Sequence, residues 1–286
     1  MNKFSESVVQ TYNRTNRQGF IYRLLCEGSA FMNLGYWHEN TANAQDAGEN
    51  LVDELLKYIP EKNGRILDVA CGQGATTRHL CKYYDAVNVV GIDISLKQLQ
   101  KCREVAPSCT FLEMDATNLG FEQASFDSVI CVEAAFHFDT RERFLSEACR
   151  VLKPGGRLVM ADIVSTKFLG RTSLEPQANV VRDQDEYAAV YRRAGFADVE
   201  IHDVTDPVVG GLCRACRTRL STGVAVAGCP TPTGLSIRAP SRQAMAWPNL
   251  RFGRVRQAPG EVRQGGRPPP ARCGVTRRLH AATATD

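Results

Sequence analysis

Short apolar runs alternate with longer amphipathic stretches along residues 65–205 of the chain. The apolar runs are predicted strands, at residues 65–70, 87–92, 110–114, 126–132, 157–163 and 199–204. The longer stretches are predicted helices, at residues 76–84, 96–105, 141–152 and 185–194. Because strands that alternate with helices form a parallel sheet covered on both faces, the pattern predicts an α/β, doubly wound, mostly parallel fold.

The two ends of the chain follow other patterns. Before residue 65 the pattern is mostly helical, and residues 46–58 place Leu51, Leu55 and Leu56 on one face. After residue 207 neither period 2 nor period 3.6 is sustained, and residues 208–286 contain 10 Gly and 8 Pro. We therefore expect three regions, which are a helical lid at residues 1–60, a folded domain at 61–207 and a tail at 208–286.

Charge separates the tail from the rest of the chain. The formal net charge is +4, but residues 1–207 carry 22 Lys and Arg against 29 Asp and Glu, whereas residues 208–286 carry 13 Arg, no Lys and 2 acids. Such a segment buries too little apolar surface to offset its ordering entropy, so we expect a disordered tail and a sheet without a normal last strand. The switch from Lys to Arg also fits translation out of the original reading frame.

Composition excludes several classes of protein. The 286 residues contain no apolar run of the roughly 18 residues that a membrane span needs, and the amino terminus is polar. These features predict a soluble, cytoplasmic protein without a membrane span, and they indicate no oligomeric state. Cys213 and Cys216 form a CxxC pair but lack two further ligands at the spacing of a zinc site, so no metal site is expected.

Two acidic residues on neighbouring predicted strands frame a glycine-rich loop. Asp68 lies in the first strand, just before the loop with Gly72 and Gly74, and Asp93 ends the second strand. The glycines let the backbone turn sharply and let a ligand approach the main chain. An acid at the end of the second strand can accept hydrogen bonds from both hydroxyls of a ribose. The pattern predicts a site for a cofactor that contains a nucleoside.

Position 77 narrows the choice of cofactor. A dinucleotide fingerprint has a third glycine there, but this chain has Thr77. The carboxylate of Asp68 beside the loop would repel a pyrophosphate and attract a cation. S-adenosylmethionine, a nucleoside that carries a sulfonium and an ammonium, is therefore the predicted cofactor.

Four segments, ILDVACGQG, GIDIS, EMDA and RVLKPGGRLVMADIV, resemble in order and spacing the class I S-adenosylmethionine-dependent methyltransferases. The resemblance covers residues 8–205 and points to the small-molecule branch, which includes ubiquinone and menaquinone, sterol, tocopherol and natural-product sugar O-methyltransferases. It implies a Rossmann-like fold and a place in secondary metabolite biosynthesis. The residues that it places around the cofactor are Asp68, Gly72, Gly74, Asp93, Gln98, Asp115, Ala116 and Glu133.

The resemblance also implies roles for these residues. Gly72 and Gly74 would line the methionine part of the cofactor. Asp93 and Gln98 would hold the ribose, and Asp115 would take the adenine amino group unless it only caps a turn.

The methyl acceptor is expected beyond the fourth and fifth predicted strands. Phe136 would supply an apolar wall, and His137 could take the proton from a hydroxyl nucleophile. The resemblance implies that Asp162, at the end of the fifth strand, orients His137, while Glu133 positions groups near the cofactor. Methyl transfer depends chiefly on alignment, so a merely packing or capping His137 and a structural Asp162 stay open as alternatives.

The run Asn33-Leu34-Gly35-Tyr36-Trp37 resembles the element that closes over cofactor and substrate in this branch. Tyr36 and Trp37 would exclude water there, and ordinary core packing is the alternative. Tyr12 and Tyr22 are further candidates for the same lid.

The predicted function is methyl transfer from S-adenosylmethionine to a small organic acceptor, with a hydroxyl oxygen of a natural product or sugar favoured. Three alternatives remain, which are carbon methylation of a quinone- or sterol-like ring, a cofactor-binding remnant with impaired catalysis, and contact of the basic tail with nucleic acid. The scarcity of aromatic residues in the tail and its scattered arginines argue against the last of these.

Overall fold

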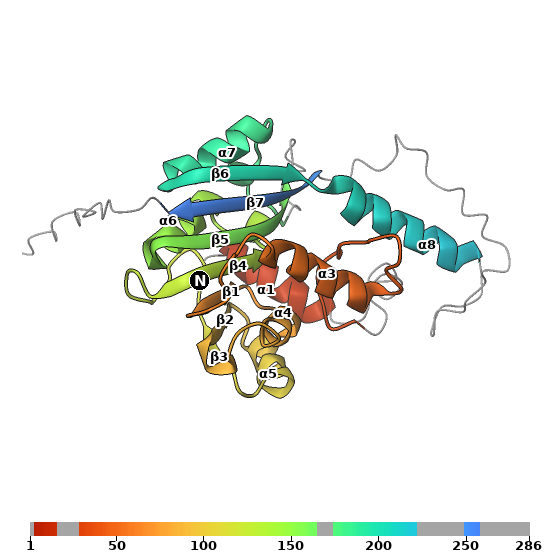
Figure 1. The fold of residues 1–286 in the computed structure, drawn as a ribbon, viewed down its shortest axis with the longest axis horizontal. Helices are drawn as coiled ribbons and strands as arrows, with labels where there is room; N and C mark the ends of the chain where they lie inside the picture. The colour runs from red at the N-terminus through yellow and green to blue at the C-terminus, as the bar shows by residue number, and fades with distance from the viewer. Residues whose placement is uncertain (1–2, 16–28, 165–173, 222–248, 258–286) are drawn as a thin grey trace, which may run out of the picture.

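A computed structural model describes residues 3–15, 29–164, 174–221 and 249–257. Seven strands form one sheet in the order β3-β2-β1-β4-β5-β7-β6 (Figure 1). They are β1 (Ile66–Val69), β2 (Val89–Asp93), β3 (Thr110–Glu113), β4 (Phe126–Val132), β5 (Leu152–Val164), β6 (Phe196–Asp203) and β7 (Asn249–Gln257).

Strands β1 to β5 are parallel, and β7 runs antiparallel between β5 and β6. From β1 the chain first proceeds outward to β2 and β3 and then returns to the other side of β1 to form β4 and β5. The prediction of a doubly wound, mostly parallel sheet is confirmed. A crevice opens at the carboxyl ends of β1 and β4, where this reversal occurs, and ligands of such folds bind there.

Helices cover both faces of the sheet (Figure 1). They are α1 (Lys3–Thr15), α3 (Ala44–Leu56), α4 (Ala75–Leu80), α5 (Leu96–Val105), α6 (Arg141–Val151), α7 (Gln184–Arg193) and α8 (Gly211–Ser221). Short helical turns are η1 (Ala86–Asn88), η2 (Ala135–His137), η3 (Gln177–Asn179) and the π-helical η4 (Asp206–Gly210).

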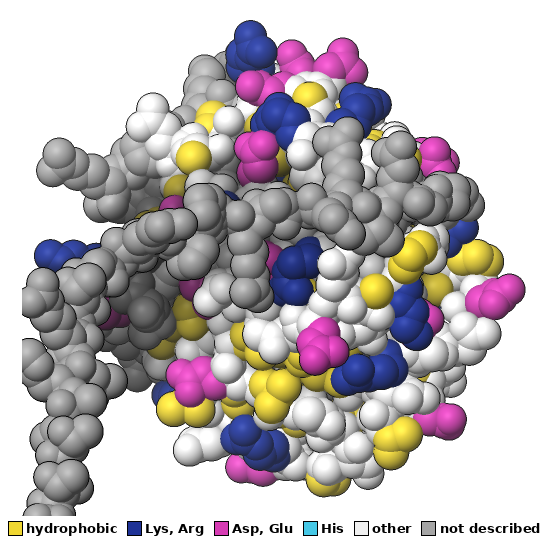
Figure 2. Space-filling model, turned by 90° about the vertical axis from the view of Figure 1, so that its left-hand side faces the viewer, with side chains coloured by type: hydrophobic (Ala, Val, Ile, Leu, Met, Phe, Trp, Pro, Cys, Tyr) yellow, Lys and Arg dark blue, Asp and Glu magenta, His cyan; other side chains and the backbone are white. Residues whose placement is uncertain are grey.

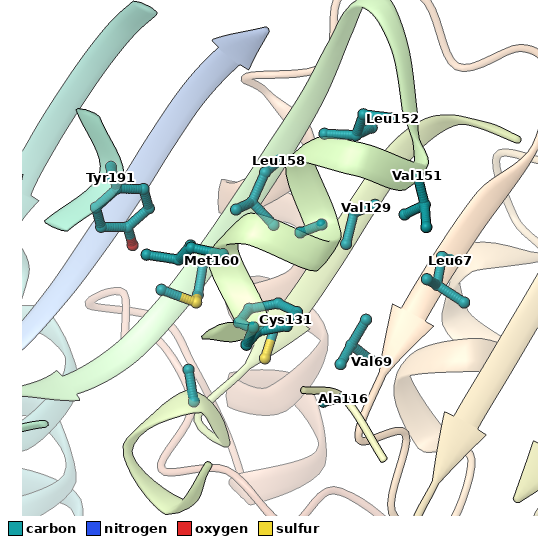
Figure 3. Close-up of a cluster of buried hydrophobic side chains, with 14 of the residues drawn as sticks. Leu67, Val69, Ala116, Val129, Cys131, Val151, Leu152, Leu158, Met160 and Tyr191 are labelled. Atoms are coloured by element: carbon teal, nitrogen blue, oxygen red, sulfur yellow. The ribbon is translucent and has the colours of Figure 1, made fainter. Parts of the chain in front are cut away.

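Alternation along the central strands sends side chains to two separate cores. Leu67 and Val69 of β1 pack into the core that α6 and α7 cover (Figure 3), whereas Ile66 packs into the core beneath α3 and α4. The same division holds in β4, where Val129 belongs to the first core and Ile130 to the second. This period of two is the reason why strands buried on both faces read as continuous apolar runs.

Side-chain caps fix where several helices begin. Asn43 accepts a hydrogen bond from the amide of Asp46 at the start of α3, at 2.9 Å, and Asp183 accepts one from Glu186 at the start of α7, at 2.8 Å. Ser95 and Thr140 cap α5 and α6 in the same way. Such oxygens satisfy amides that have no partner within the helix.

Strand β5 begins earlier than predicted, at Leu152 and not at residue 157. Leu152 pairs with Phe126, and a register shift between Phe126 and Ser128 separates this pair from the regular ladder. Pro154 and the two glycines that follow it therefore lie within an irregular strand start.

The expectation that the sheet lacks a normal last strand is wrong, because β7 pairs with β5 and β6. Leu250 and Phe252 alternate in its sequence, but Gly253 and Arg254 follow, and the next apolar residue, Val255, has the other parity. This break hides the period of two. Of the predicted tail, α8 and β7 are described, while residues 222–248 and 258–286 lie outside the described residues.

The described surface mixes charges of both signs. On the face in Figure 2, Lys and Arg side chains are interspersed with Asp and Glu side chains. No helix within the described residues is long and apolar enough to cross a membrane.

Candidate active site

A cavity lies at the carboxyl ends of β1 to β4 and encloses about 1090 Å³ of empty space, its open mouth included. Helix α1 lies over it and contributes Ser5, Val8, Val9 and Tyr12, which have the spacing of one helical face. The carboxyl end of α1 is held by the β2–α5 region, where Ser95 donates to the Asn13 side chain at 2.9 Å and Lys97 donates to the Asn13 carbonyl at 2.9 Å. Helix α1 therefore covers part of the crevice.

The loop between β1 and α4 forms one wall of the cavity. Gly72 and Gly74 adopt positive φ angles of 54° and 84°. A Cβ atom at Gly74 would lie 3.0 Å from the Cα of Cys102, so glycine is required there for both its backbone conformation and its small size. Gly72 lines the cavity, whereas Gly74 is the N-cap of α4 and supports the loop from behind.

Asp93 ties this loop to the end of β2. Its carboxylate accepts hydrogen bonds from the amides of Gly72, at 3.0 Å, and Ser95, at 2.8 Å, and it lines the cavity. Burial raises its pKa to about 6, although the backbone donors lower it. A carboxylate with two oxygens has further lone pairs that can accept from ligand hydroxyls.

Asp68 lies behind the cavity and does not line it. It is 1% exposed and accepts a 2.6 Å hydrogen bond from the hydroxyl of Thr77. Burial raises its pKa to about 7, and the charge of Asp93 acts in the same direction. The residue that replaces the third glycine of a dinucleotide site thus anchors α4 to β1.

Three buried polar atoms on the cavity wall have no hydrogen-bond partner, and they are Asn33 Oδ1, Gln98 Nε2 and Glu133 Oε1. Buried polar atoms in native proteins are nearly always satisfied, so these three mark where a ligand supplies the partners. Ala116 and Asp115 also line the cavity, beyond the end of β3. Asp115 Oδ1 accepts from both the amide and the hydroxyl of Thr117, each at 2.8 Å.

Glu133 directly follows β4 and has a strained backbone conformation, with φ of 50°. One carboxyl oxygen accepts a hydrogen bond from the Leu34 amide at 2.9 Å, and the other is the atom without a partner. Burial raises the pKa of Glu133 to about 8, against an ordinary value of 4.5. The carboxyl group is therefore protonated at neutral pH unless a cation binds beside it.

This shift predicts a pH dependence of stability. The pKa of Glu133 is higher in the folded state than in the unfolded state. The protonated Glu133 therefore contributes its full stabilisation below pH 4.5, and this stabilisation is lost as the pH rises through about 8. In urea titrations between about pH 5 and about pH 8, Glu133 should lower the free energy of unfolding by up to about 1.4 kcal/mol per pH unit. The Glu133→Gln variant should lose this slope, while the exposed Glu122→Gln variant keeps it. Equal slopes in all three proteins would contradict the shift.

His137, at the end of η2, reaches the cavity from the side of β4. Its Nδ1 lies 2.7 Å from the carbonyl oxygen of Leu174 and must donate to it, which leaves Nε2 as an acceptor for the hydroxyl of Tyr12, also at 2.7 Å. Burial lowers the pKa of His137 to about 4. The imidazole is therefore neutral near pH 7 and presents a lone pair on Nε2.

Asp162, the predicted orienting partner of His137, does not contact the imidazole. It is fully buried, accepts from Arg141 Nε at 2.6 Å and from Tyr187 at 2.9 Å, and does not line the cavity. Its other oxygen accepts from the amide of Phe136 at 3.1 Å. The Phe136 ring packs against His137, with ring centroids 3.8 Å apart, but does not line the cavity either. Sequence reasoning missed Arg141.

Tyr36 and Trp37 are not among the residues that line the cavity. Trp37 packs against Leu212 of α8, donates from Nε1 to the Leu34 carbonyl at 2.9 Å, and lies where a Cβ at Gly211 would clash. The residues of the predicted lid that do line the cavity come from α1 and from the segment 30–33, which includes Asn33. For α1, the amphipathic spacing of Val8, Val9 and Tyr12 is the sequence signal. Tyr22 lies outside the described residues.

The cavity suits S-adenosylmethionine. Three acidic residues, Asp93, Asp115 and Glu133, line the cavity together with the residues that carry the partnerless atoms. Acidic groups attract a ligand that carries a sulfonium and an ammonium, and oxygen and amide atoms without partners suit its ribose and amino groups. The residues that would hold this cofactor are Gly72, Asp93, Gln98, Asp115, Ala116 and Glu133.

Sequence comparison supports the same assignment. The family described as "Methyltransferase domain" matches residues 67–160. The chain is 33% identical over 188 residues to 27-O-demethylrifamycin SV methyltransferase of Amycolatopsis mediterranei, an alignment that covers 60% of this chain and 68% of that protein. It is 31% identical over 202 residues to erythromycin 3''-O-methyltransferase of Saccharopolyspora erythraea, covering 63% and 66%. The chain thus spans about two thirds of the length of these relatives.

Solved structures share the fold. Phosphoethanolamine N-methyltransferase 2 of Haemonchus contortus, in complex with S-adenosylmethionine, has a TM-score of 0.65 and 19% identity, with coverage of 90% of this chain and 60% of that one. Geranyl diphosphate C-methyltransferase of Streptomyces coelicolor has a TM-score of 0.62 and 12% identity, with coverage of 90% and 98%. Together with the sequence relatives, these findings show that the chain belongs to the class I S-adenosylmethionine-dependent methyltransferases, in the branch that acts on small molecules.

Proposed function

We propose that this protein transfers the methyl group of S-adenosylmethionine to a hydroxyl oxygen of a small natural product or sugar, with His137 as the general base. The two sequence relatives named above are, by their names, methyltransferases of rifamycin and erythromycin compounds, which supports a hydroxyl acceptor.

The observation that carries the proposal is the state of His137. Its imidazole is neutral, its tautomer is set by Leu174, and its Nε2 accepts a hydrogen bond from an O–H group, that of Tyr12, at the wall of the cavity. An acceptor hydroxyl that displaces the Tyr12 hydroxyl from this nitrogen would be held in the same way. The base can then take the proton while the oxygen forms its new bond to carbon.

The other residues of the site would bind the cofactor and the methyl acceptor and align them with each other. The cofactor, when bound, supplies a methyl group on a positively charged sulfur, and the reaction is a displacement at that carbon, which is fast only if the nucleophile is in line. Asp93 and the Gly72 loop fix one end of the cavity, and His137 fixes the acceptor at the other. Helix α1 lies over both ends. It is held by Ser95 through Asn13 and, until an acceptor takes its place on His137, by the hydroxyl of Tyr12.

The decisive experiment gives the protein S-adenosylmethionine labelled in its methyl carbon and a panel of hydroxylated polyketides, macrolides and deoxysugar glycosides. A methoxy carbon signal in the NMR spectrum of the product is expected. A label on a ring carbon would instead favour the carbon-methylation alternative, and cofactor binding without labelled product from any acceptor would favour the impaired remnant.

Replacing His137 tests its role. The His137→Gln variant should lose about 100- to 10,000-fold in kcat on a hydroxyl acceptor, because general-base catalysis contributes that much. Its affinity for S-adenosylmethionine should stay within about 2-fold, since the contacts of the Gly72 loop are untouched. His38→Gln removes an exposed histidine and serves as the matched control. Full turnover by His137→Gln would refute the general-base role.

A further inference from the structure

A network of buried polar groups surrounds Arg141, at the start of α6 and outside the cavity. The Arg141 side chain is buried and donates to three groups, which are the carboxylate of Asp162 at 2.6 Å, the carbonyl of Ile163 at 3.3 Å and the carbonyl of Asn179. Burial alone would lower the pKa of Arg141, but Asp162 and Tyr187 hold it above its ordinary value. The guanidinium therefore stays charged beneath the site.

Both residues beside His137 are tied to this network. The Phe136 amide donates to Asp162 at 3.1 Å. The side-chain amide of Asn179 donates to the carbonyls of Phe136, at 3.1 Å, and Phe138, at 2.8 Å. Asn179 in turn accepts from the backbone amide of Arg141 at 2.8 Å. The backbone on each side of His137 is thus fixed by groups that Arg141 holds.

The imidazole itself is fixed from the same direction. Its Nδ1 donates to Leu174, which is five residues before Asn179 in the segment that ends in η3. Glu175, next to Leu174, has a carboxyl oxygen 3.8 Å from Arg141 Nη2. Arg141 therefore connects the loop that carries His137 to the segment that sets its tautomer.

We propose that Arg141 and Asn179 are positioning residues that hold His137 in the orientation and tautomer needed to accept a proton from the methyl acceptor. The proposal rests on the proposed function of His137 and extends it to residues that do not touch either ligand. It also gives Asp162 a role other than direct partner of the imidazole, since Asp162 acts on the backbone at Phe136.

The arrangement separates the two halves of the site. The cofactor end is built from the ends of β1, β2 and β3. Within the described part of the chain, the hydrogen bonds of Arg141 and Asn179 go to other residues than those that would hold the cofactor. Loss of either residue should therefore reduce turnover without weakening cofactor binding. A residue with a merely structural role would change both together, or neither.

The test compares Asn179→Ala and Arg141→Lys with the unaltered protein. Lysine keeps the charge beside Asp162 but cannot reproduce the fork of donors. For each variant, kcat and KM for a hydroxyl acceptor, the dissociation constant of S-adenosylmethionine and the nitrogen NMR signals of the imidazoles are measured across pH. The His137→Gln variant assigns the His137 signals. Arg150→Lys is the matched control, because Arg150 lies on the same helix and donates to Glu147 and to the carbonyls of Leu119 and Phe121.

We expect kcat to fall about 10- to 100-fold in Asn179→Ala, since misplacement of a catalytic group by about 1 Å has effects of up to about 100-fold. The affinity for S-adenosylmethionine should stay within about 2-fold of the starting value. In Asn179→Ala, the His137 signals should move toward those of a mixture of the two tautomers. The kcat and the His137 signals of Arg141→Lys should lie between those of Asn179→Ala and those of the unaltered protein. Unchanged imidazole signals and kcat would overturn the proposal, and so would a parallel loss of kcat, cofactor affinity and melting temperature. Turnover of the His137→Gln variant tests whether His137 is the general base. The imidazole signals test whether Arg141 and Asn179 position His137, so failure of one proposal can be told from failure of the other.

Discussion

An Asp93→Ala variant should bind S-adenosylmethionine about 100-fold more weakly, because hydrogen bonds to a charged group contribute about 1.5 to 3 kcal/mol each. The carboxylate lines the cavity and also holds the Gly72 amide, so its removal takes away ligand contacts and releases the loop that forms the cavity wall. Calorimetric titration of the cofactor into the purified variant measures this loss directly.

Two further measurements make the test specific. Burial raises the pKa of Asp93 to about 6, so Asp93 loses its negative charge as the pH drops through that value. The affinity of the unaltered protein for S-adenosylmethionine, which is a cation, should fall over the same range. The Ala variant should lack this part of the pH dependence. Asp85→Ala removes an exposed acid from the turn before β2 and should leave the affinity unchanged. If Asp93→Ala binds the cofactor as tightly as the Asp85 control does, the assignment of the cofactor site is wrong.

The central part of the fold could be predicted because local pattern and tertiary structure agree there. Residues such as Ile66, Leu67 and Val69 are apolar on both sides of the strand since both faces of β1 are covered. Asp93 could be placed because the end of a parallel strand determines where its side chain lies. Composition and charge alone would not have distinguished this site from many others.

Other parts of the site depend on residues far away in the sequence. Asp162 was expected to orient His137, but its carboxylate accepts a hydrogen bond from Arg141, which lies 21 residues earlier in the sequence and carries no motif of its own. Such partners decide which polar side chains near a strand end face the cavity. Here His137 lines the cavity, whereas Asp162 does not. Trp37 similarly packs against α8, a contact that no pattern near Trp37 indicates.

Ending the chain at residue 248, just before β7, should unfold the protein or make it aggregate. Strand β7 pairs with β5 at eight positions and with β6 at seven, so its loss leaves unpaired edges on both neighbours and detaches β6 from the sheet. Each hydrogen bond contributes about 1 kcal/mol net, so removal of β7 lowers the free energy of unfolding by more than about 5 kcal/mol. This is comparable with the whole stability of a domain.

A chain that ends at residue 257 is the matched control, since it is only nine residues longer and keeps β7. It should remain soluble and unfold at the temperature of the full chain, and it should bind S-adenosylmethionine equally well. It also removes the five arginines of residues 258–286, so any salt-sensitive binding of nucleic acid by that segment would disappear while the fold is retained. A chain of residues 1–248 that stays soluble and melts at the same temperature as the chain of residues 1–257 would show that β7 does not hold β6 on the sheet.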